Sequence, residues 1–213
     1  LFKKSVVQIL IDNNLEHLIF PSGEGWYSDP MHLNDIEPIL KDGKYWKKGD
    51  IFFSVKHINT IFLYRPKQDK IIWYKKGPWS HQHDIDIISE KEISIFDNNK
   101  NYDLSSVENF NKITIFNFEN NETRDYLNNA MEKNKIKTFA EGLHTILPNK
   151  DLMVEDTENG RLALFKNDGS LKWQFINKTI DDEVYRLNWS RFLDSKNYSD
   201  IIKMIYNNKH ECN

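Results

Sequence analysis

The stretch Asp50–Tyr74, DIFFSVKHINTIFLYRPKQDKIIWY, decides the fold of this chain. It contains three short runs rich in β-branched and aromatic residues, Asp50–Val55, Asn59–Tyr64 and Lys70–Tyr74. Runs of this length and composition, separated by polar residues, predict β-strands. The links between them are too short for a helical crossover, so the strands are expected to form an antiparallel meander.

The same pattern continues outward along the chain, with turn signals such as Asn159-Gly160 and Asp168-Gly169 between the runs. The further predicted strands are Ser5–Leu10, Ile85–Ile88, Glu92–Phe96, Lys112–Phe116, Asp151–Glu155, Arg161–Lys166 and Leu171–Phe175. Only Asn121–Lys133 and Tyr198–Asn207 have helical patterns. The second carries an apolar stripe, with Ser199 as a candidate N-cap.

A repeat organises these strands into blade-like units at about 32–77, 81–142 and 143–178. Each unit opens with a histidine and continues through about three more strands, and a predicted strand and helix occupy residues 179–213. Four strands in about 40–60 residues is typical of a β-propeller blade. We therefore expect one all-β domain over residues 1–213, a β-propeller of four-stranded antiparallel blades with a short C-terminal helix.

The number of blades leaves the ring open. The three units and a strand at each end make about three and a half blades, whereas a closed propeller has 4–8. Open blades would expose strand edges, which soluble proteins rarely tolerate. Three explanations remain at this point: the chain is the C-terminal part of a longer polypeptide with upstream blades, a second chain completes the ring, or the unit is not a propeller.

Composition narrows the class of partner. The 213 residues carry a net charge of −3, so no basic field favours nucleic acid or an anionic membrane surface. No stretch approaches the roughly 18 apolar residues of a membrane span. The single cysteine, Cys212, excludes an intrachain disulfide and a cysteine-based zinc site.

The candidate chemistry lies in the unit-opening histidines His32, His83 and His144. The first strand of each propeller blade lines the central channel, so residues at equivalent positions converge on the axis. Neutral imidazoles there can bind zinc or copper. Alternatively, one imidazole acts as a nucleophile while the others move protons and hold an anion, or all of them only hydrogen-bond water.

An ordered series of short motifs adds a resemblance. The series is His32-Leu-Asn-Asp, Gly49–Lys56, Asn59-Thr-Ile-Phe, Lys70–Trp73, Gln82-His83-Asp84, Ile93–Asn98 and Leu147-Pro148-Asn149. In this order, and over about residues 30–178, it resembles the arylsulfotransferase (aryl-sulfate sulfotransferase) family.

The resemblance implies a six-bladed propeller, of which this chain would be the C-terminal portion. Proteins of this family are often periplasmic or secreted. It implies transfer of a sulfuryl group from a phenolic sulfate ester to an acceptor phenol, without a nucleotide donor such as PAPS and with no cofactor or metal. The route would pass through a sulfated histidine. By this resemblance His144 is the favoured nucleophile, with His83 and His32 as acid–base and oxygen-binding partners; the roles of His83 and His144 can be exchanged.

Departures from the family pattern affect the predicted substrate-binding residues. Lys56 stands where the family has an arginine, and Lys100 is the only cation soon after Asn98. Lysine is a point charge without the forked geometry of a guanidinium. Trp79 is the predicted aromatic platform at the channel mouth. Because of these departures, a non-catalytic propeller used for binding or assembly remains the alternative to an enzyme.

Overall fold

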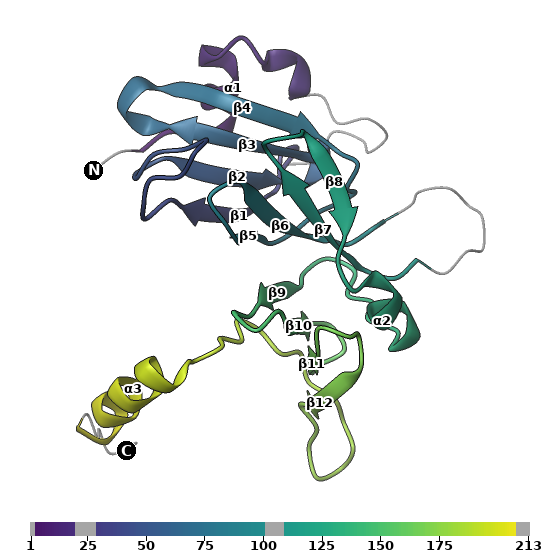
Figure 1. Cartoon of the computed structure of the whole chain (residues 1–213). Coiled ribbons are helices and arrows are strands. Elements are labelled where there is room, and N and C mark those ends of the chain that lie inside the picture. Colours follow the sequence, from purple (N-terminus) through teal and green to yellow (C-terminus); the bar gives the residue numbers. More distant parts are fainter. Residues whose placement is uncertain (1–2, 20–28, 101–108, 208–213) are drawn as a thin grey trace, which may run out of the picture.

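In the computed structural model, residues 3–19, 29–100 and 109–207 are described; the side chains of 195–197, 205 and 207 are not, and Cys212 lies outside these ranges. The described chain forms three four-stranded antiparallel sheets (Figure 1). Sheet one holds β1 (Leu33–Pro38), β2 (Ile51–Val55), β3 (Thr60–Arg65) and β4 (Lys70–Lys76). Sheet two holds β5 (Ile85–Ile87), β6 (Glu92–Asp97), β7 (Lys112–Asn117) and β8 (Glu122–Asp125), and sheet three holds β9 (Leu143–Ile146), β10 (Leu152–Asp156), β11 (Arg161–Phe165) and β12 (Leu171–Ile176).

Each sheet is a meander whose strands pair in chain order, which confirms the predicted blades. The two middle strands of each sheet are buried, the last strand is largely exposed, and the first strand is half-buried. The fold is therefore all-β and propeller-like, with a short C-terminal helix. The first strands, β1, β5 and β9, are the ones that border the candidate site.

Two apolar layers hold the sheets face to face. Between sheets one and two, Phe52 and Leu63 pack with Ile93 and Phe116. Between sheets two and three the layer includes Phe96, Ile113, Val154, Ala163 and Phe165. Because neighbouring residues on a strand point to opposite faces, the middle strands of sheet two supply both layers, and those of sheet one supply one layer and the cluster on its outer face. Nearly continuous apolar runs such as IFF and TIFLY follow from this burial on both faces.

The prediction of a strand at Ser5–Leu10 is wrong, because α1 (Val6–Asp12) occupies that segment. Ser5 caps the helix, and its Oγ accepts the Gln8 N–H at 3.1 Å. Ile9 and Leu10 are buried against the outer face of sheet one. Two short 3₁₀ turns, Glu16–Leu18 and Lys56–Ile58, pack nearby, and a third spans Pro66–Gln68.

The segment predicted as one helix at Asn121–Lys133 divides in two. Its first half forms β8, and only α2 (Asn128–Lys133) is helical. Ala130 and Met131 of α2 are buried in the layer between sheets two and three.

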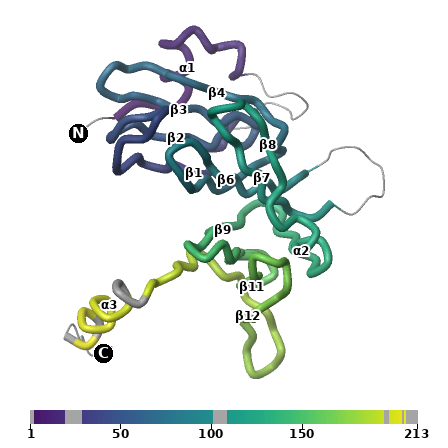
Figure 2. The backbone as a smooth tube through the Cα atoms, viewed as in Figure 1, coloured from purple at the N-terminus to yellow at the C-terminus, as the bar shows by residue number. Residues whose placement is uncertain are grey.

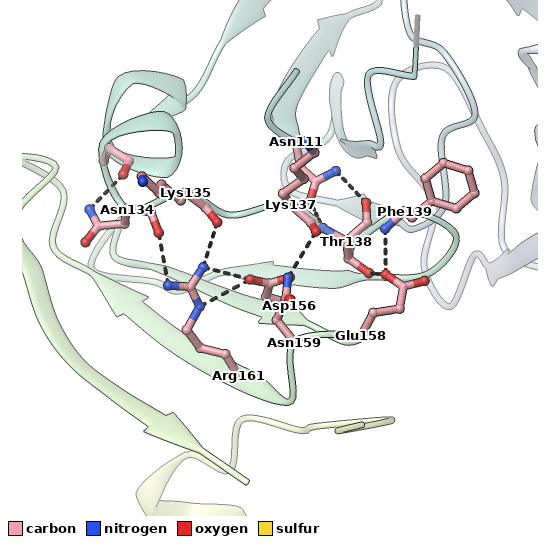
Figure 3. A network of polar contacts seen from close by, with 11 residues as sticks. Asn111, Asn134, Lys135, Lys137, Thr138, Phe139, Asp156, Glu158, Asn159 and Arg161 are labelled. Atoms are coloured by element: carbon pink, nitrogen blue, oxygen red, sulfur yellow. Dashed lines mark hydrogen bonds and ion pairs between the residues drawn. The ribbon is translucent and has the colours of Figure 1, made fainter. Parts of the chain in front are cut away.

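A polar network ties α2 and the residues after it to sheet three (Figure 3). Arg161 is ion-paired with buried Asp156 at 2.7 Å and donates to the carbonyls of Asn134 and Lys135, each at 2.9 Å. Glu158 accepts the Ala140 N–H at 2.9 Å. These contacts fix the path of residues 134–140 just before β9.

The predicted helix at the C-terminal end is confirmed as α3 (Ser195–Asn207). It stands apart from the sheets at the end of an extended segment (Figures 1 and 2). The strand predicted in residues 179–213 is absent from the described part of that range, where a single bridge pairs Lys178 with Val184. Within the described residues no helix is both long and apolar enough to cross a bilayer.

Sheet three differs from the others in one respect, since its outer face has only a small buried cluster, Leu147, Met153 and Leu164. On that face Leu164 pairs with Trp173, and Leu162 pairs with Phe175. Trp173 is 42% exposed and Phe175 is 50% exposed. This face resembles the two buried sheet faces in composition but is largely open.

Candidate functional site

A cavity of about 730 Å³ opens where the first strands of the three sheets come together. Its lining comes from β1, β5 and β9, from the end of β10 and from residues 188–191. His83 and His144 both line it, whereas His32, Lys56, Asn98, Lys100 and Trp79 are not among its lining residues. The structure thus brings two of the three predicted histidines to one cavity.

Both ring nitrogens of His144 have hydrogen-bond partners. Its Nδ1 is 2.7 Å from Asp84 Oδ2, and its Nε2 is 2.8 Å from Ser94 Oγ. The Asp84 carboxylate also accepts the backbone N–H of His144 at 2.8 Å. Both ring nitrogens are engaged, and the side chain is 0% exposed. Burial opposes protonation of His144, but the hydrogen bond that its Nδ1–H donates to Asp84 and the nearby charges of Asp84 and Asp86 raise its pKa.

His83 has the opposite environment. Its Nδ1 is buried and has no hydrogen-bond partner among the described residues. Burial lowers the pKa of His83 to about 4; the Asp84 charge opposes this shift, and those of Lys56 and His32 reinforce it. The imidazole is therefore neutral at pH 7, so one of its two ring nitrogens carries a lone pair.

The backbone around His83 is held from both sides. The Gln82 amide donates to the carbonyls of Val55 and Thr60, each at 3.1 Å. The Gln82 carbonyl accepts the Asn34 amide at 3.0 Å, and the His83 N–H donates to the Phe96 carbonyl at 2.9 Å. His83 is thus fixed where sheets one and two meet.

His32 lies outside β1, at a positive φ of 48°, so it is not at a position equivalent to His144. Its ring stacks on His57 at 4.9 Å, and His57 lies 6.2 Å from His81. The His32 Nδ1 is 2.8 Å from Asp29 Oδ2. His32, His57 and His81 thus form a group of histidines apart from His83 and His144. The charge of His32 contributes to the lowered pKa of His83.

The remaining predicted residues are held in the body of the protein. Trp79 is 2% exposed in the layer between sheets one and two, and its indole N–H donates to the Asn59 carbonyl. This burial contradicts the predicted stacking platform at the channel mouth. The Asn98 amide donates to the carbonyls of Thr138 and Glu141. Lys100 lies over the Phe139 ring, with its Nζ 4.2 Å from the ring centroid, and Lys56 is 7% exposed.

Carboxyl groups that are not among the predicted site residues dominate the cavity wall. They are Asp35, Glu37, Asp84, Asp86, Glu141 and Glu155, against Arg191 as the single Lys or Arg among the lining residues of the described chain. Asp35 repeats the role of Asp84, since its carboxylate accepts the Ile85 N–H of the next sheet at 3.0 Å. The sequence does contain a signal for this acidic wall, since Asp35 and Glu37 on β1, and Asp84 and Asp86 near β5, are each two residues apart. Alternate residues share one face of a strand, so each pair is expected to point the same way.

Burial and the neighbouring charges raise the pKa of three of these groups. Burial, followed by the charges of Asp86, Asp35 and Asp84, raises the pKa of Glu37 to about 8. Burial and the Asp84 charge raise the pKa of Asp35 to about 6. Burial also raises the pKa of Asp86 to about 6, although the His144 charge opposes the shift. Glu37 is therefore a carboxylic acid at pH 7 and can donate a proton.

One group in the described residues has the spacing of a metal site. Donor atoms of Asp84, Asp86 and His144 lie within 4.8 Å of one another. Two carboxylates and an imidazole suit a divalent ion. The His144 nitrogens are already engaged by Asp84 and Ser94, so an ion would have to displace one of these contacts to use His144.

Comparison with solved structures finds partial similarities, one of them to a β-propeller. The WD40 β-propeller domain of Doa1 aligns with a TM-score of 0.43 and 15% identity, over 67% of this chain and 40% of that one. U3-55K aligns with a TM-score of 0.41 and 11% identity, over 71% of this chain and 40% of that one. The chain thus spans two fifths of the length of each.

No curated protein matches the chain. A model of the arylsulfotransferase (ASST) family matches residues 1–178. That match includes all three sheets and the two histidines on the cavity wall. Because it covers most of the 213 residues, the chain belongs to the arylsulfotransferase (ASST) family.

Proposed function

We propose that this protein transfers a sulfuryl group from a phenolic sulfate ester to an acceptor phenol, through a sulfohistidine, in the periplasm or outside the cell. Membership of the ASST family supports the class of reaction. The observation that carries the proposal is the position of His83, which lines the cavity and has no hydrogen-bond partner for its buried Nδ1 among the described residues. Burial lowers the pKa of His83 to about 4, which favours the neutral imidazole.

His83, rather than His144, is the nucleophile in this proposal. An imidazole attacks sulfur only through a nitrogen lone pair, and the low pKa of His83 keeps its ring in that form. His144 has both nitrogens in hydrogen bonds and a raised pKa. His144 acts instead as a positioning residue that holds Asp84 and β9 at the cavity wall.

The first half-reaction forms the N–S bond to His83 and breaks the S–O bond to the aryl group. The leaving phenolate takes a proton from Glu37, which lines the same cavity and is protonated at pH 7. In the second half-reaction the acceptor phenol gives its proton back to Glu37 and attacks sulfur, and His83 leaves as a neutral imidazole. Lys56 and His32 do not line the cavity, so their charges act on the His83 ring and do not contact the sulfuryl oxygens.

The test is release of nitrophenol from 4-nitrophenyl sulfate. The wild-type chain is expected to give a stoichiometric burst without an acceptor and turnover with added phenol, because nucleophilic catalysis separates the two steps. His83→Ala is expected to abolish both, while His17→Ala, an exposed histidine on the Glu16–Leu18 turn, is expected to keep both. A burst that persists in His83→Ala would refute His83 as the nucleophile.

A second candidate function has one observation in its favour. The cavity wall carries six carboxyl groups, which disfavour an anionic ester. A propeller that binds neutral or cationic molecules without chemistry would fit this wall. If no aryl sulfate yields nitrophenol or a sulfated protein, this binding role replaces the enzyme.

We also propose that another four-stranded sheet covers the open face of sheet three. The faces between sheets one and two and between sheets two and three are both buried by the next sheet. Trp173 and Phe175 lie on the corresponding face of sheet three and are about half exposed. An apolar face of this kind is a typical interaction surface. In a solution of this chain alone, a second copy supplies the sheet.

A further inference from the structure

The segment that follows the last sheet returns to the cavity. Residues 188–191 line the cavity although they lie beyond the 178 residues matched by the family model. We call residues 187–191 the strap. The Leu187 N–H donates to the Thr157 carbonyl at 3.2 Å, and the Ser190 N–H donates to Glu155 Oε2 at 2.6 Å. The strap is therefore attached to the end of β10 on both sides of Trp189.

Trp189 has an unusual backbone and an exposed ring. Its φ is +64°, which is uncommon for a bulky residue and costs free energy, so it persists only where the surroundings impose it. The attachments at Leu187 and Ser190 impose it here. The residue lines the cavity and yet is 72% exposed, so much of its indole remains available to a ligand.

Arg191 stands beside this indole. Its Cζ lies 5.3 Å from the centre of the Trp189 ring, in a cation–π contact. Arg191 is also the only Lys or Arg among the described residues on the cavity wall. A guanidinium fork matches two oxygens of a sulfate or sulfonate, and an indole stacks on a flat aromatic ring. The pair therefore offers one group for each half of an aryl sulfate.

We infer that Trp189 and Arg191 form a binding subsite for an aromatic ring that bears an anionic sulfur ester, an inference that rests on the proposed function. Trp189 stacks on the ring, and Arg191 holds the anionic group at the mouth of a cavity whose carboxyl groups would otherwise repel it. Glu155 is a positioning residue, because it holds the strap through Ser190.

The test measures binding of 4-nitrobenzenesulfonate, which cannot transfer a sulfuryl group, and of 4-nitrophenol by calorimetry with the full chain, at about pH 5.5 so that 4-nitrophenol is neutral. Arg191→Ala is expected to weaken sulfonate binding about 10-fold and leave 4-nitrophenol binding unchanged, since only the sulfonate is charged. Trp189→Ala is expected to weaken both about 10-fold, and Trp189→Phe is expected to restore most of the loss. In turnover, both Ala variants should raise KM for 4-nitrophenyl sulfate and leave kcat within about 2-fold, because they remove uniform binding.

Matched controls separate the subsite from surface effects. Trp173→Ala and Arg124→Ala remove an exposed tryptophan and an exposed arginine outside the cavity lining, and are expected to bind both probes as the wild type does. Wild-type affinities in Trp189→Ala and Arg191→Ala, or no sulfonate binding by the wild type, would overturn the subsite even if His83 is sulfated. Binding that depends on both residues, without any sulfated histidine, would instead refute the proposed function and leave the subsite intact.

Discussion

The Asp84–His144–Ser94 chain is expected to contribute much of the stability of the contact between sheets two and three. Asp84 precedes β5, Ser94 is on β6 and His144 is on β9, so the chain crosses from one sheet to the next. A single oxygen, Asp84 Oδ2, accepts both the backbone N–H and the Nδ1–H of His144. Removing Asp84 would leave two buried donors without an acceptor.

The magnitude follows from these two bonds. A hydrogen bond to a charged group contributes about 1.5–3 kcal/mol, so Asp84→Ala is expected to lower the free energy of unfolding by about 3–5 kcal/mol. Asp84→Asn can place an amide oxygen where Oδ2 lies, so it is expected to lose only about 1–2 kcal/mol. Urea denaturation followed by circular dichroism measures both. The control, Asp182→Asn, removes the charge of an exposed carboxylate paired with Lys178, keeps a side chain that tolerates the positive φ of 66° there, and is expected to change stability by less than about 0.5 kcal/mol.

The same pair gives a pH dependence with a definite sign. The folded-state pKa of His144 is raised, so its contribution to stability is fully present below its unfolded pKa of about 6.5. That contribution is lost as pH rises through the folded pKa. The difference between the wild type and Asp84→Ala should therefore be larger at pH 6 than at pH 9. A difference below about 1 kcal/mol, or one that grows with pH, would refute this account of the chain.

Three further predictions concern other parts of the molecule. Arg161→Ala leaves the buried Asp156 carboxylate without its ion pair and should cost about 3 kcal/mol of unfolding free energy in urea; a loss below about 1 kcal/mol would contradict the role of the network in Figure 3. The rate of the nitrophenol burst without an acceptor should decline as pH rises through about 8, because Glu37 then loses the proton that it gives to the leaving phenolate. Glu37→Gln should lower this rate about 10²–10⁴-fold at pH 7 and remove the decline; an unchanged pH profile would exclude Glu37 as the acid. Light scattering should show association of the chain at micromolar concentration that Trp173→Ser with Phe175→Ser reverses, whereas a wild-type monomer would contradict the proposed cover of sheet three.

The strands could be predicted because burial on both faces selects apolar, β-branched runs, as in Asp50–Tyr74. The same preference explains the error at Ser5–Leu10, where Val6, Val7 and Ile9 have β-branched side chains but sit in a capped helix that buries Ile9 against sheet one. Tertiary packing outweighed local propensity there. The division of Asn121–Lys133 into β8 and α2 depends on pairing with β7, which the local pattern does not contain.

The site was less accessible to sequence reasoning. The spacing of His32, His83 and His144 suggested equivalent positions, but side-chain direction depends on strand register. The pairing of β1 with β2 shifts between Leu33 and Asp35, and His32 falls outside the strand. His83 and His144 then differ in their hydrogen bonding. The buried Nδ1 of His83 has no partner among the described residues, whereas both ring nitrogens of His144 are in hydrogen bonds. No sequence pattern distinguishes these environments.

The most direct test of the central claim is the identity of the sulfated residue. The full chain, incubated with 4-nitrophenyl sulfate without an acceptor, would be digested at neutral pH and mapped by mass spectrometry. The account predicts one sulfuryl group on His83, none on His144, and loss of the label on addition of phenol. A label on His144 or on any residue other than His83 would contradict it.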